Sequence, residues 1–161
     1  MPRPLVVNAS PLIILAKTGF LDLLRLGGNP VLVPLAVVQE VQQRGQGDPA
    51  VQALAQTPWL SVVHPGPAPP LLQPFHLHPG EEATLTWALA NAGSEALIDD
   101  QRARRCAKAL GIPHLGCLGL VILARRQGAL PAARPVLEQL RQAGLRLGDH
   151  LMNQALSLVG E

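Results

Sequence analysis

The sequence contains few aromatic residues and no tyrosine. Aromatic side chains make up 2% of its 161 residues, and 48% of the residues are hydrophobic. The predicted core must therefore consist mainly of leucine, valine, alanine and isoleucine. Proteins that bind single-stranded nucleic acid on stacked rings need several aromatics, so an extended platform of that kind is excluded. The length suits a single domain covering residues 1–161.

Cysteine and long apolar segments are also scarce. Two cysteines, Cys106 and Cys117, are too few for a disulfide framework. The apolar segment at residues 6–17 contains Asn8, Ser10 and Pro11 and is too short to span a bilayer. No signal-peptide pattern is visible at the start, so we expect a soluble, cytoplasmic protein without membrane partners.

Carboxylates are few, which makes the grouped ones informative. The chain has eleven acidic and thirteen basic residues, with a net charge of +2. This mild excess neither requires nor excludes a polyanionic partner. Most of the basic residues are arginine, whose planar guanidinium group suits phosphate recognition.

Short apolar runs alternate with helical patterns along the whole chain. Strands are predicted near residues 5–7, 31–33, 59–63, 96–98 and 113–115, with helical patterns between them and after the last. This order implies right-handed crossovers and a parallel sheet. The expected fold is three-layer α/β, with a central parallel sheet of four to five short strands flanked by helices.

Capping signals and prolines predict the boundaries. Ser10 with Pro11, and Asp48 with Pro49, are expected to start helices, and Asp149 is expected to cap the last one. The C-terminal helices are predicted within residues 131–161. Residues 64–79 contain six prolines, which prevents regular strand pairing and indicates a surface loop or arm.

Polar residues with oxygen ligands follow several of the predicted strands. In a parallel sheet the strand-to-helix turns share one edge, where ligands bind. If the side chains converge there, repulsion raises some of their pKa values unless cations neutralise them. Oxygen ligands of this kind suit Mg²⁺ or Mn²⁺. The candidates are Asn8, Glu40, Glu81, Glu82, Asp99 and Asp100.

Simpler explanations exist for the same residues. Acids at helix N-termini are favoured by capping and by the helix dipole, which alone could account for Glu81, Glu82, Asp99 and Asp100. Asp100 could also pair with Arg104 one turn later. Glu40 could be an ordinary exposed residue on a helix.

Five segments, in order, resemble one known family. They are VVNASPLIILAK, VPLAVVQEV, GEEATLTWALA, LIDDQRARRCAKALGI and GCLGLVILARRQG. This series is similar to the PIN-domain family, and within it to the VapC-like toxin ribonuclease subgroup with Asn at the first acid position. The resemblance covers most of the chain up to the final helices.

The resemblance implies a nuclease dependent on Mg²⁺ or Mn²⁺. The family's four acid positions fall on Asn8, Glu40, Glu81 and Asp99 or Asp100, with Glu82 a poorer substitute for Glu81. Ser10 matches the hydroxyl near the first acid, whereas Cys117 replaces the usual Ser or Thr. Asn8 replaces the general Asp, which removes one negative charge. An RNA substrate, a small antitoxin protein and a homodimer are the implied partners.

The expected reaction is hydrolysis of RNA by a metal-activated water. The expected catalytic residues are Asn8, Glu40, Glu81, Asp99 and Asp100, and all of them except Asp100 are expected metal ligands. Candidate RNA contacts are Ser10, Arg102, Arg104, Arg105, Arg125 and Arg126, although each arginine could equally belong to a solvated helix face.

The sequence is also compared with the patterns expected for other functions. A degenerate PIN domain, acting as an RNA- or protein-binding module, would be consistent with Asn8. A receiver-like regulatory domain is disfavoured because it needs an acid pair after the first strand. His76 and His78 lie close enough for a zinc site, but a surface loop explains both.

Overall fold

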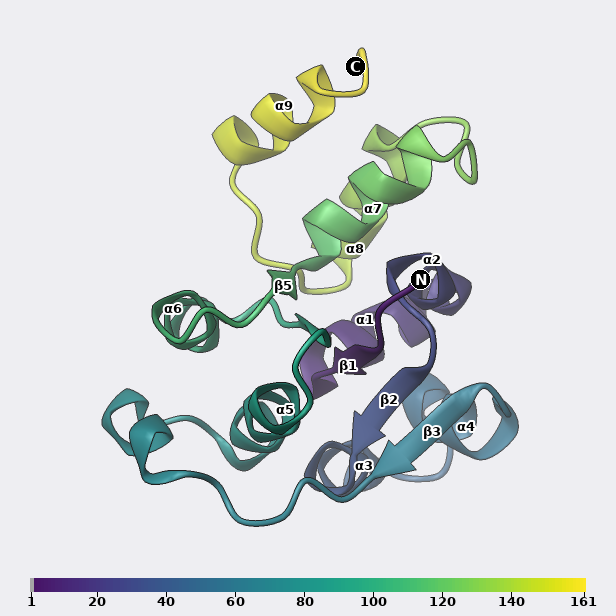
Figure 1. Ribbon diagram of the computed structural model, residues 1–161. Coiled ribbons are helices and arrows are strands. Elements are labelled where there is room, and N and C mark those ends of the chain that lie inside the picture. Colours follow the sequence, from purple (N-terminus) through teal and green to yellow (C-terminus); the bar gives the residue numbers. More distant parts are fainter. Residues whose placement is uncertain (1) are drawn as a thin grey trace.

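A sheet of five parallel strands runs through the centre of the computed structural model, which describes residues 2–161 (Figure 1). Its strand order is β3-β2-β1-β4-β5. The strands are β1 Leu5–Val7, β2 Val31–Pro34, β3 Leu60–Val63, β4 Glu95–Leu97 and β5 His114–Leu115. The predicted α/β fold with a short-stranded parallel sheet is confirmed.

Helices cover both faces of this sheet. They are α1 Ala9–Thr18, α2 Leu24–Gly27, α3 Leu35–Gln42, α4 Pro49–Gln56, α5 Pro79–Ala90, α6 Gln101–Ala109, α7 Cys117–Arg126, α8 Arg134–Gln142 and α9 Asp149–Ser157. Two short 3₁₀ segments, η1 Leu21–Leu23 and η2 Pro70–Phe75, complete the list. Within residues 2–161, no helix is long and apolar enough to cross a membrane.

Successive residues at the end of β4 pack into two separate hydrophobic clusters. Leu97 belongs to the larger cluster, which includes side chains from α1, α3, α7 and α8. Its neighbours Ala96 and Ile98 face the smaller cluster formed with α5, α6 and η2. In that cluster Leu72 of η2 is fully buried, so the proline-rich segment packs against the sheet's second helical layer.

The direction of the crossovers reverses beside β1. The chain adds β2 and then β3 on one side of β1, and afterwards crosses back to add β4 and β5 on the other. In open parallel sheets, such a reversal leaves a crevice at the carboxyl ends of the two strands. The crevice here lies at the ends of β1 and β4.

The first helix begins earlier than predicted. Ser10 was expected to be its N-cap, but α1 already starts at Ala9, and Asn8 precedes it in an extended conformation. Pro11 is then the third helical residue, still within the first turn, where its missing N–H leaves no hydrogen bond unmade. This shift moves Asn8 to the strand end itself and leaves the Ser10 side chain exposed.

The other two capping predictions have different outcomes. Asp48 does cap α4, because its Oδ1 accepts a hydrogen bond of 2.9 Å from the backbone N–H of Ala50. The N-cap of α9 is Gly148, so the prediction for Asp149 is wrong. Asp149 is instead the first helical residue, and its carboxylate forms an ion pair with Arg141 at 2.6 Å.

Candidate metal and nucleic-acid site

Asn8 and Asp99 follow the adjacent strands β1 and β4. The two strands pair with Val7 opposite Leu97, and the Asn8 backbone N–H donates to the Leu97 carbonyl at 3.1 Å. The Asn8 side chain is 5% exposed and makes no capping hydrogen bond to α1. Its amide oxygen is therefore available to a ligand in the crevice.

Glu40 approaches the same place from α3. That helix buries Val37 and Val41 and packs against α5, which brings Glu40 next to Gly80. A Cβ atom placed on Gly80 would lie 2.8 Å from Glu40 Oε2 and 3.3 Å from Asn8 Oδ1. Because glycine has no side chain, both oxygens can approach its Cα closely, which brings Glu40 next to Asn8.

Glu81 is a buried carboxylate in the first turn of α5. Its Oε2 accepts a hydrogen bond of 3.2 Å from the backbone N–H of His78, and only 8% of the residue is exposed. Burial raises the pKa of Glu81, and repulsion from Asp100 and Glu40 raises it further, against the lowering effect of the His78 hydrogen bond. A cation in the crevice would relieve this penalty.

Asp99 is held by the N-terminus of α7. Its Oδ1 accepts a 2.8 Å hydrogen bond from the backbone N–H of Cys117, at the positive end of the helix dipole. Its Oδ2 is buried and has no hydrogen-bond partner within residues 2–161. Burial, followed by the charge of Asp99, raises the pKa of the Cys117 thiol well above its ordinary value, so that thiol stays neutral.

Asp100 caps α6 and does not pair with Arg104. Its Oδ2 accepts a 2.9 Å hydrogen bond from the backbone N–H of Ala103. Arg104 instead donates from Nη1 to the carbonyl of Ile98 at 3.2 Å. The ion pair between Asp100 and Arg104 that the spacing suggested is thus absent in the described part of the chain, because both side chains bond to the backbone instead. Within residues 2–161, the other Asp100 oxygen, Oδ1, accepts no hydrogen bond.

Four of these residues, Asn8, Glu81, Asp99 and Asp100, line one cavity of about 340 Å³ at the carboxyl edge of the sheet. It is lined by Asn8, Ser10, Ile14, Glu81, Asp99, Asp100, Gly144, Leu145 and Arg146. Glu40 does not line this cavity, but its Oε2 lies beside Gly80, close to Asn8 Oδ1. Glu82 faces a different hollow, beside His64 and Thr86, so of the two neighbouring glutamates only Glu81 reaches the site.

The donor set fits a hydrated divalent ion better than a closed metal cage. Within residues 2–161, no three His, Cys, Asp or Glu side chains are grouped closely enough to hold an ion by themselves. This also holds for His76 and His78. However, Asp99 Oδ2 has no hydrogen-bond partner within residues 2–161, and Asn8 and Glu40 both place an oxygen close to Gly80. A nearby cation would also stabilise the buried Glu81 carboxylate. Mg²⁺ keeps several waters and needs few direct protein ligands.

The predicted RNA-binding arginines lie in different places. Arg104 and Arg105 line a hollow on α6 together with Lys108 and His114, next to the acidic cavity. Arg102 donates to the His76 carbonyl at 3.3 Å, on the side of the proline-rich segment.

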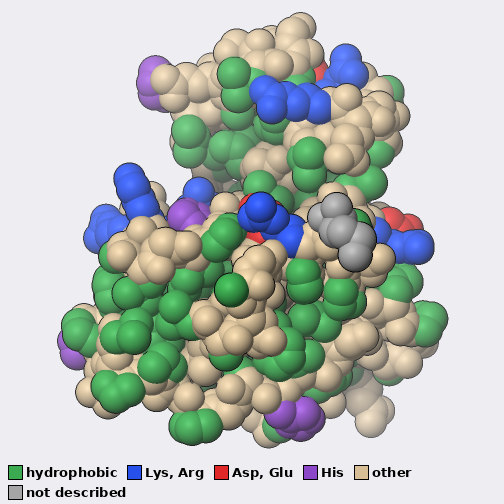
Figure 2. Space-filling model, viewed as in Figure 1, with side chains coloured by type: hydrophobic (Ala, Val, Ile, Leu, Met, Phe, Trp, Pro, Cys, Tyr) green, Lys and Arg blue, Asp and Glu red, His purple; other side chains and the backbone are tan. Residues whose placement is uncertain are grey.

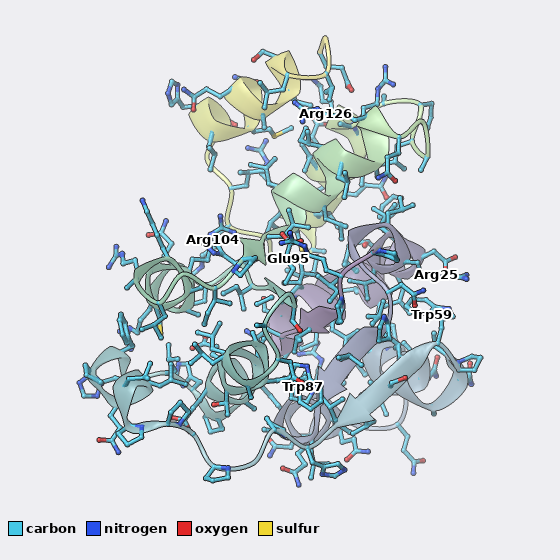
Figure 3. The ribbon with its side chains drawn as sticks, in the orientation of Figure 1. Arg25, Trp59, Trp87, Glu95, Arg104 and Arg126 are labelled. Carbon is cyan, nitrogen blue, oxygen red and sulfur yellow. The ribbon has the colours of Figure 1, made fainter. Side chains whose placement is uncertain are left out.

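Arg125 and Arg126 are at the opposite end of α7 from the acids. Arg125 approaches Glu161 at 3.5 Å. Figure 3 shows Arg126 well apart from Arg104, which belongs to α6. Since α7 starts beside Asp99, its ten residues carry these two arginines about 15 Å away. They are not brought to the cavity.

Among the described residues that line the cavity, Arg146 is the one cation, and it was not predicted from the sequence. It lies in the connection between α8 and α9, an irregular segment without helical periodicity. Its two apolar neighbours, Leu145 and Leu147, both pack on the larger core, and this hydrophobic-charged-hydrophobic order was the only available signal.

Comparison with known proteins identifies a family. A family model described as a PIN domain matches residues 4–161, nearly the whole chain. No curated protein and no solved structure matches the chain.

Proposed function

Because the chain belongs to the PIN-domain family, whose members are generally nucleases, we propose that it hydrolyses RNA phosphodiester bonds with Mg²⁺ or Mn²⁺. One observation carries the proposal: Asn8, Glu81 and Asp99 line one cavity at the switch point of the sheet, and Glu40 lies beside Asn8 at Gly80. Among them, Asp99 has a buried oxygen with no partner within residues 2–161. A structural role alone leaves that oxygen unexplained.

Each donor has a defined part in this proposal. Asp99 is oriented through Oδ1 by the α7 N-terminus, which leaves Oδ2 for the ion. Glu81 is held by the His78 N–H, and Glu40 and Asn8 offer oxygens across Gly80. When bound, a divalent ion would supply an activated water and neutralise charge on the attacked phosphate.

The neutral Asn8 weakens the site without dismantling it. An amide oxygen still ligates hard cations, but it brings no charge to attract them. The neutral Cys117 thiol offers neither a nucleophile nor a hard ligand. The proposed reaction therefore depends on the three carboxylates and Asp100, and needs no covalent intermediate with the protein.

The test is cleavage of a panel of structured RNAs in the presence of Mg²⁺ or Mn²⁺. Wild type should cut, whereas Glu40→Ala and Asp99→Asn should lower the rate at least about 100-fold, because each removes a charged ligand. Glu82→Ala is the matched control, since Glu82 faces another hollow. Full activity in both site variants would overturn the assignment.

A second candidate is a PIN domain that binds RNA or a protein without cutting. Asn8 in place of an acid favours it, as does the lack of a ready-made three-ligand group within residues 2–161. Tight RNA binding with no cleavage at any Mn²⁺ concentration would select this candidate.

The cellular role proposed here is that of a toxin restrained by a small antitoxin that covers the acidic cavity, with the toxin acting as a homodimer. The support is the resemblance to VapC-like toxins. Expression of wild type should arrest growth and Glu40→Ala should not, whereas arrest by both proteins would contradict the role. Light scattering of the purified chain tests the dimer.

A further inference from the structure

The turn at residues 75–78, which connects the proline-rich segment to α5, has an unusual backbone conformation. Within residues 2–161, His76 is the one residue other than glycine with a positive φ, 49°, and its ψ is 50°. A residue with a Cβ atom keeps this left-handed conformation only where the surrounding contacts hold it, and such residues cluster at functional sites.

Packing and a proline hold the turn on both sides of His76. Phe75 and Leu77 pack against the smaller hydrophobic cluster. Pro79 then restricts His78 to an extended backbone, with φ −67° and ψ 157°. The chain therefore enters α5 in one defined direction.

The end of this turn orients a proposed metal ligand. The His78 backbone N–H donates to Glu81 Oε2 at 3.2 Å, and Glu81 lines the acidic cavity. A carboxylate at this position of a helix that is held by the preceding N–H has fewer rotamers available. The position of the Glu81 oxygens therefore depends on where the turn places the His78 N–H.

Arg102 joins this turn to α6. Its Nη1 donates to the His76 carbonyl at 3.3 Å, which is the only hydrogen bond between the turn and α6 within residues 2–161. Arg102 lies two residues after Asp100, the N-cap of α6, and η2 packs against that helix. The bond therefore links the segment that carries Asp99 and Asp100 to the segment that carries Glu81.

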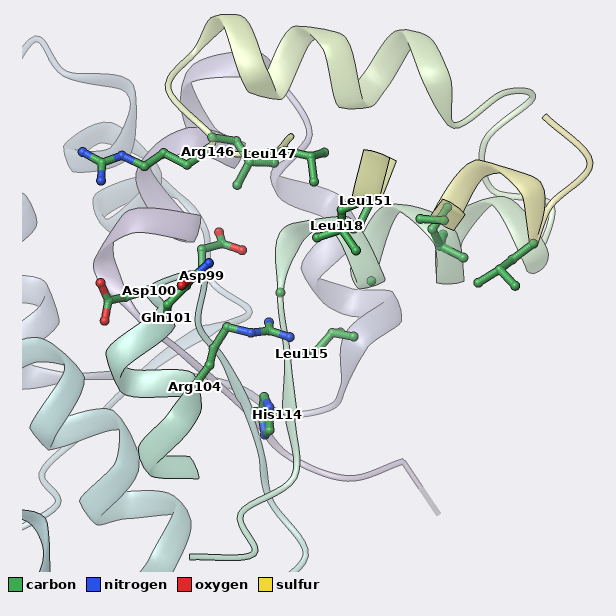
Figure 4. Close-up of a pocket in the computed structure, with 16 residues that line it drawn as sticks. Asp99, Asp100, Gln101, Arg104, His114, Leu115, Leu118, Arg146, Leu147 and Leu151 are labelled. Carbon is green, nitrogen blue, oxygen red and sulfur yellow. The ribbon is translucent and has the colours of Figure 1, made fainter. Parts of the chain in front are cut away.

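Arg102 and Arg104 lie on different sides of α6. Two residues correspond to about 200° around a helix, so their side chains leave it in nearly opposite directions. Figure 4 shows the Arg104 side chain extending from α6 toward Leu115 of β5, whereas Arg102 reaches the proline-rich segment. Arg102 is thus separate from the hollow lined by Arg104, Arg105 and Lys108.

We propose that Arg102 is a positioning residue for Glu81. It holds the His76 carbonyl, and through this turn it fixes the His78 N–H and the Glu81 carboxylate relative to the end of β4. The proline-rich segment gains a role in the nuclease, because it supplies the turn that Arg102 holds. The inference rests on the proposed metal-dependent function, in which Glu81 is a ligand.

Electrostatics alone predicts the opposite effect on metal binding. Figure 2 shows cationic side chains at the surface over α6, and each of these charges repels a divalent ion. Removing one of them should strengthen Mn²⁺ binding slightly, whereas loss of a positioning bond should weaken it. A role in RNA contact alone predicts a third result, because Mn²⁺ binding to the RNA-free protein would then not depend on Arg102.

The experiment measures Mn²⁺ affinity by calorimetry in the absence of RNA. Arg102→Ala should bind Mn²⁺ about five-fold more weakly than wild type, the loss expected for one exposed hydrogen bond. Arg102→Lys should recover part of the affinity, because an ammonium group can also donate to the carbonyl. Lys108→Ala is the matched control, since it removes the same charge from an exposed position of α6. This control should bind Mn²⁺ at least as tightly as wild type.

A second measurement follows the His78 N–H directly in the metal-free protein. Amide hydrogen exchange at His78 should be about five-fold faster in Arg102→Ala than in wild type, because the turn is less firmly held. Arg102→Lys should restore part of the protection, and Lys108→Ala should leave it unchanged.

Distinct results would overturn the proposal. Mn²⁺ affinity in Arg102→Ala equal to or above that of wild type, or unchanged exchange at His78, would exclude a positioning role. Faster exchange throughout α5 and α6 would also overturn it, because the loss of affinity would then reflect general loosening of the fold. Absence of Mn²⁺ binding in wild type, with exchange at His78 still dependent on Arg102, would overturn the metal-dependent function but not the contact between Arg102 and the turn.

Discussion

Replacing Gly80 by alanine should impair the proposed metal site without unfolding the protein. An alanine Cβ would lie 2.8 Å from Glu40 Oε2, 3.3 Å from Asn8 Oδ1 and 3.4 Å from Val37 Cγ2. The first contact is shorter than real Cβ contacts, and the second requires Asn8 to give by a few tenths of an ångström. Glu40 is an exposed residue, so its carboxylate can move away without a shift of the α5 backbone.

The size of the effect follows from these distances. A carbon–oxygen contact needs about 3.3 Å, so the Glu40 carboxylate must retreat by about 0.5 Å. Catalytic groups need positions accurate to about 0.5 Å, so the rate should fall about ten-fold. Alanine is favoured over glycine in helices by up to about 1 kcal/mol, which offsets the cost of moving Glu40. The free energy of unfolding should therefore change by less than about 1 kcal/mol.

The assay compares Mn²⁺-dependent RNA cleavage, Mn²⁺ affinity by calorimetry, and urea unfolding in Gly80→Ala and wild type. Gly47→Ala is the matched control, because a Cβ there would meet nothing within 4 Å in the described structure. Unchanged cleavage and unchanged affinity in Gly80→Ala would refute the argument that Asn8 and Glu40 converge on one ligand. A large loss of stability would refute the argument that Glu40 yields.

Three further substitutions test Glu81, Asp99 and Asn8 one at a time. Burial raises the pKa of Glu81, so metal-free wild type should lose stability as pH rises from the ordinary pKa of about 4.5 through the raised one. Glu81→Gln keeps the acceptor for the His78 N–H and should remove this pH-dependent loss of stability. The measurement is urea unfolding from pH 4 to 8. The same loss of stability in both proteins would contradict the prediction. Asp99→Asn keeps the hydrogen bond from the Cys117 N–H but replaces Oδ2, which has no partner within residues 2–161. Mn²⁺ should therefore no longer raise the melting temperature of this variant. An undiminished effect of Mn²⁺ would count against Asp99 as a ligand. Asn8→Asp adds a negative charge beside Glu40, so it should raise Mn²⁺ affinity about ten-fold and lower the stability of the metal-free protein. Calorimetry that shows no gain in affinity would remove Asn8 from the proposed site.

The fold could be predicted because its signals are local and repeated. Each strand is a short apolar run followed by a helical pattern, and parallel order follows from that alternation. Boundaries were less certain, as Ser10 and Asp149 illustrate. In both cases a residue with strong capping propensity lies one or two positions inside the helix. Ser10 is inside α1 because β1 already ends at Val7. Asp149 is the first residue of α9, where its carboxylate pairs with Arg141.

The candidate site was predictable only as far as strand topology determines it. Asn8 and Asp99 each follow a strand, and in any parallel sheet the carboxyl ends of the strands lie at the same edge. Glu81 could not be separated from Glu82 by sequence, because the choice depends on how α5 rotates against the sheet.

Cations were harder to place than acids. Arg125 and Arg126 look like arginines that grip RNA, but the length of α7 carries them away from the cavity. Arg146 reaches the cavity through packing of Leu145 and Leu147 against helices distant in sequence. No local pattern encodes that arrangement, since it depends on long-range contacts of the loop.

The most direct test of the proposed metal site is a crystal structure of the protein soaked with Mn²⁺, with the ion located by anomalous scattering. We predict a peak among Asn8, Glu40, Glu81 and Asp99, with at least one direct bond of about 2.1 Å to Asp99 Oδ2. A crystal that holds Mn²⁺ elsewhere, or nowhere, at a concentration that saturates RNA cleavage would contradict the account.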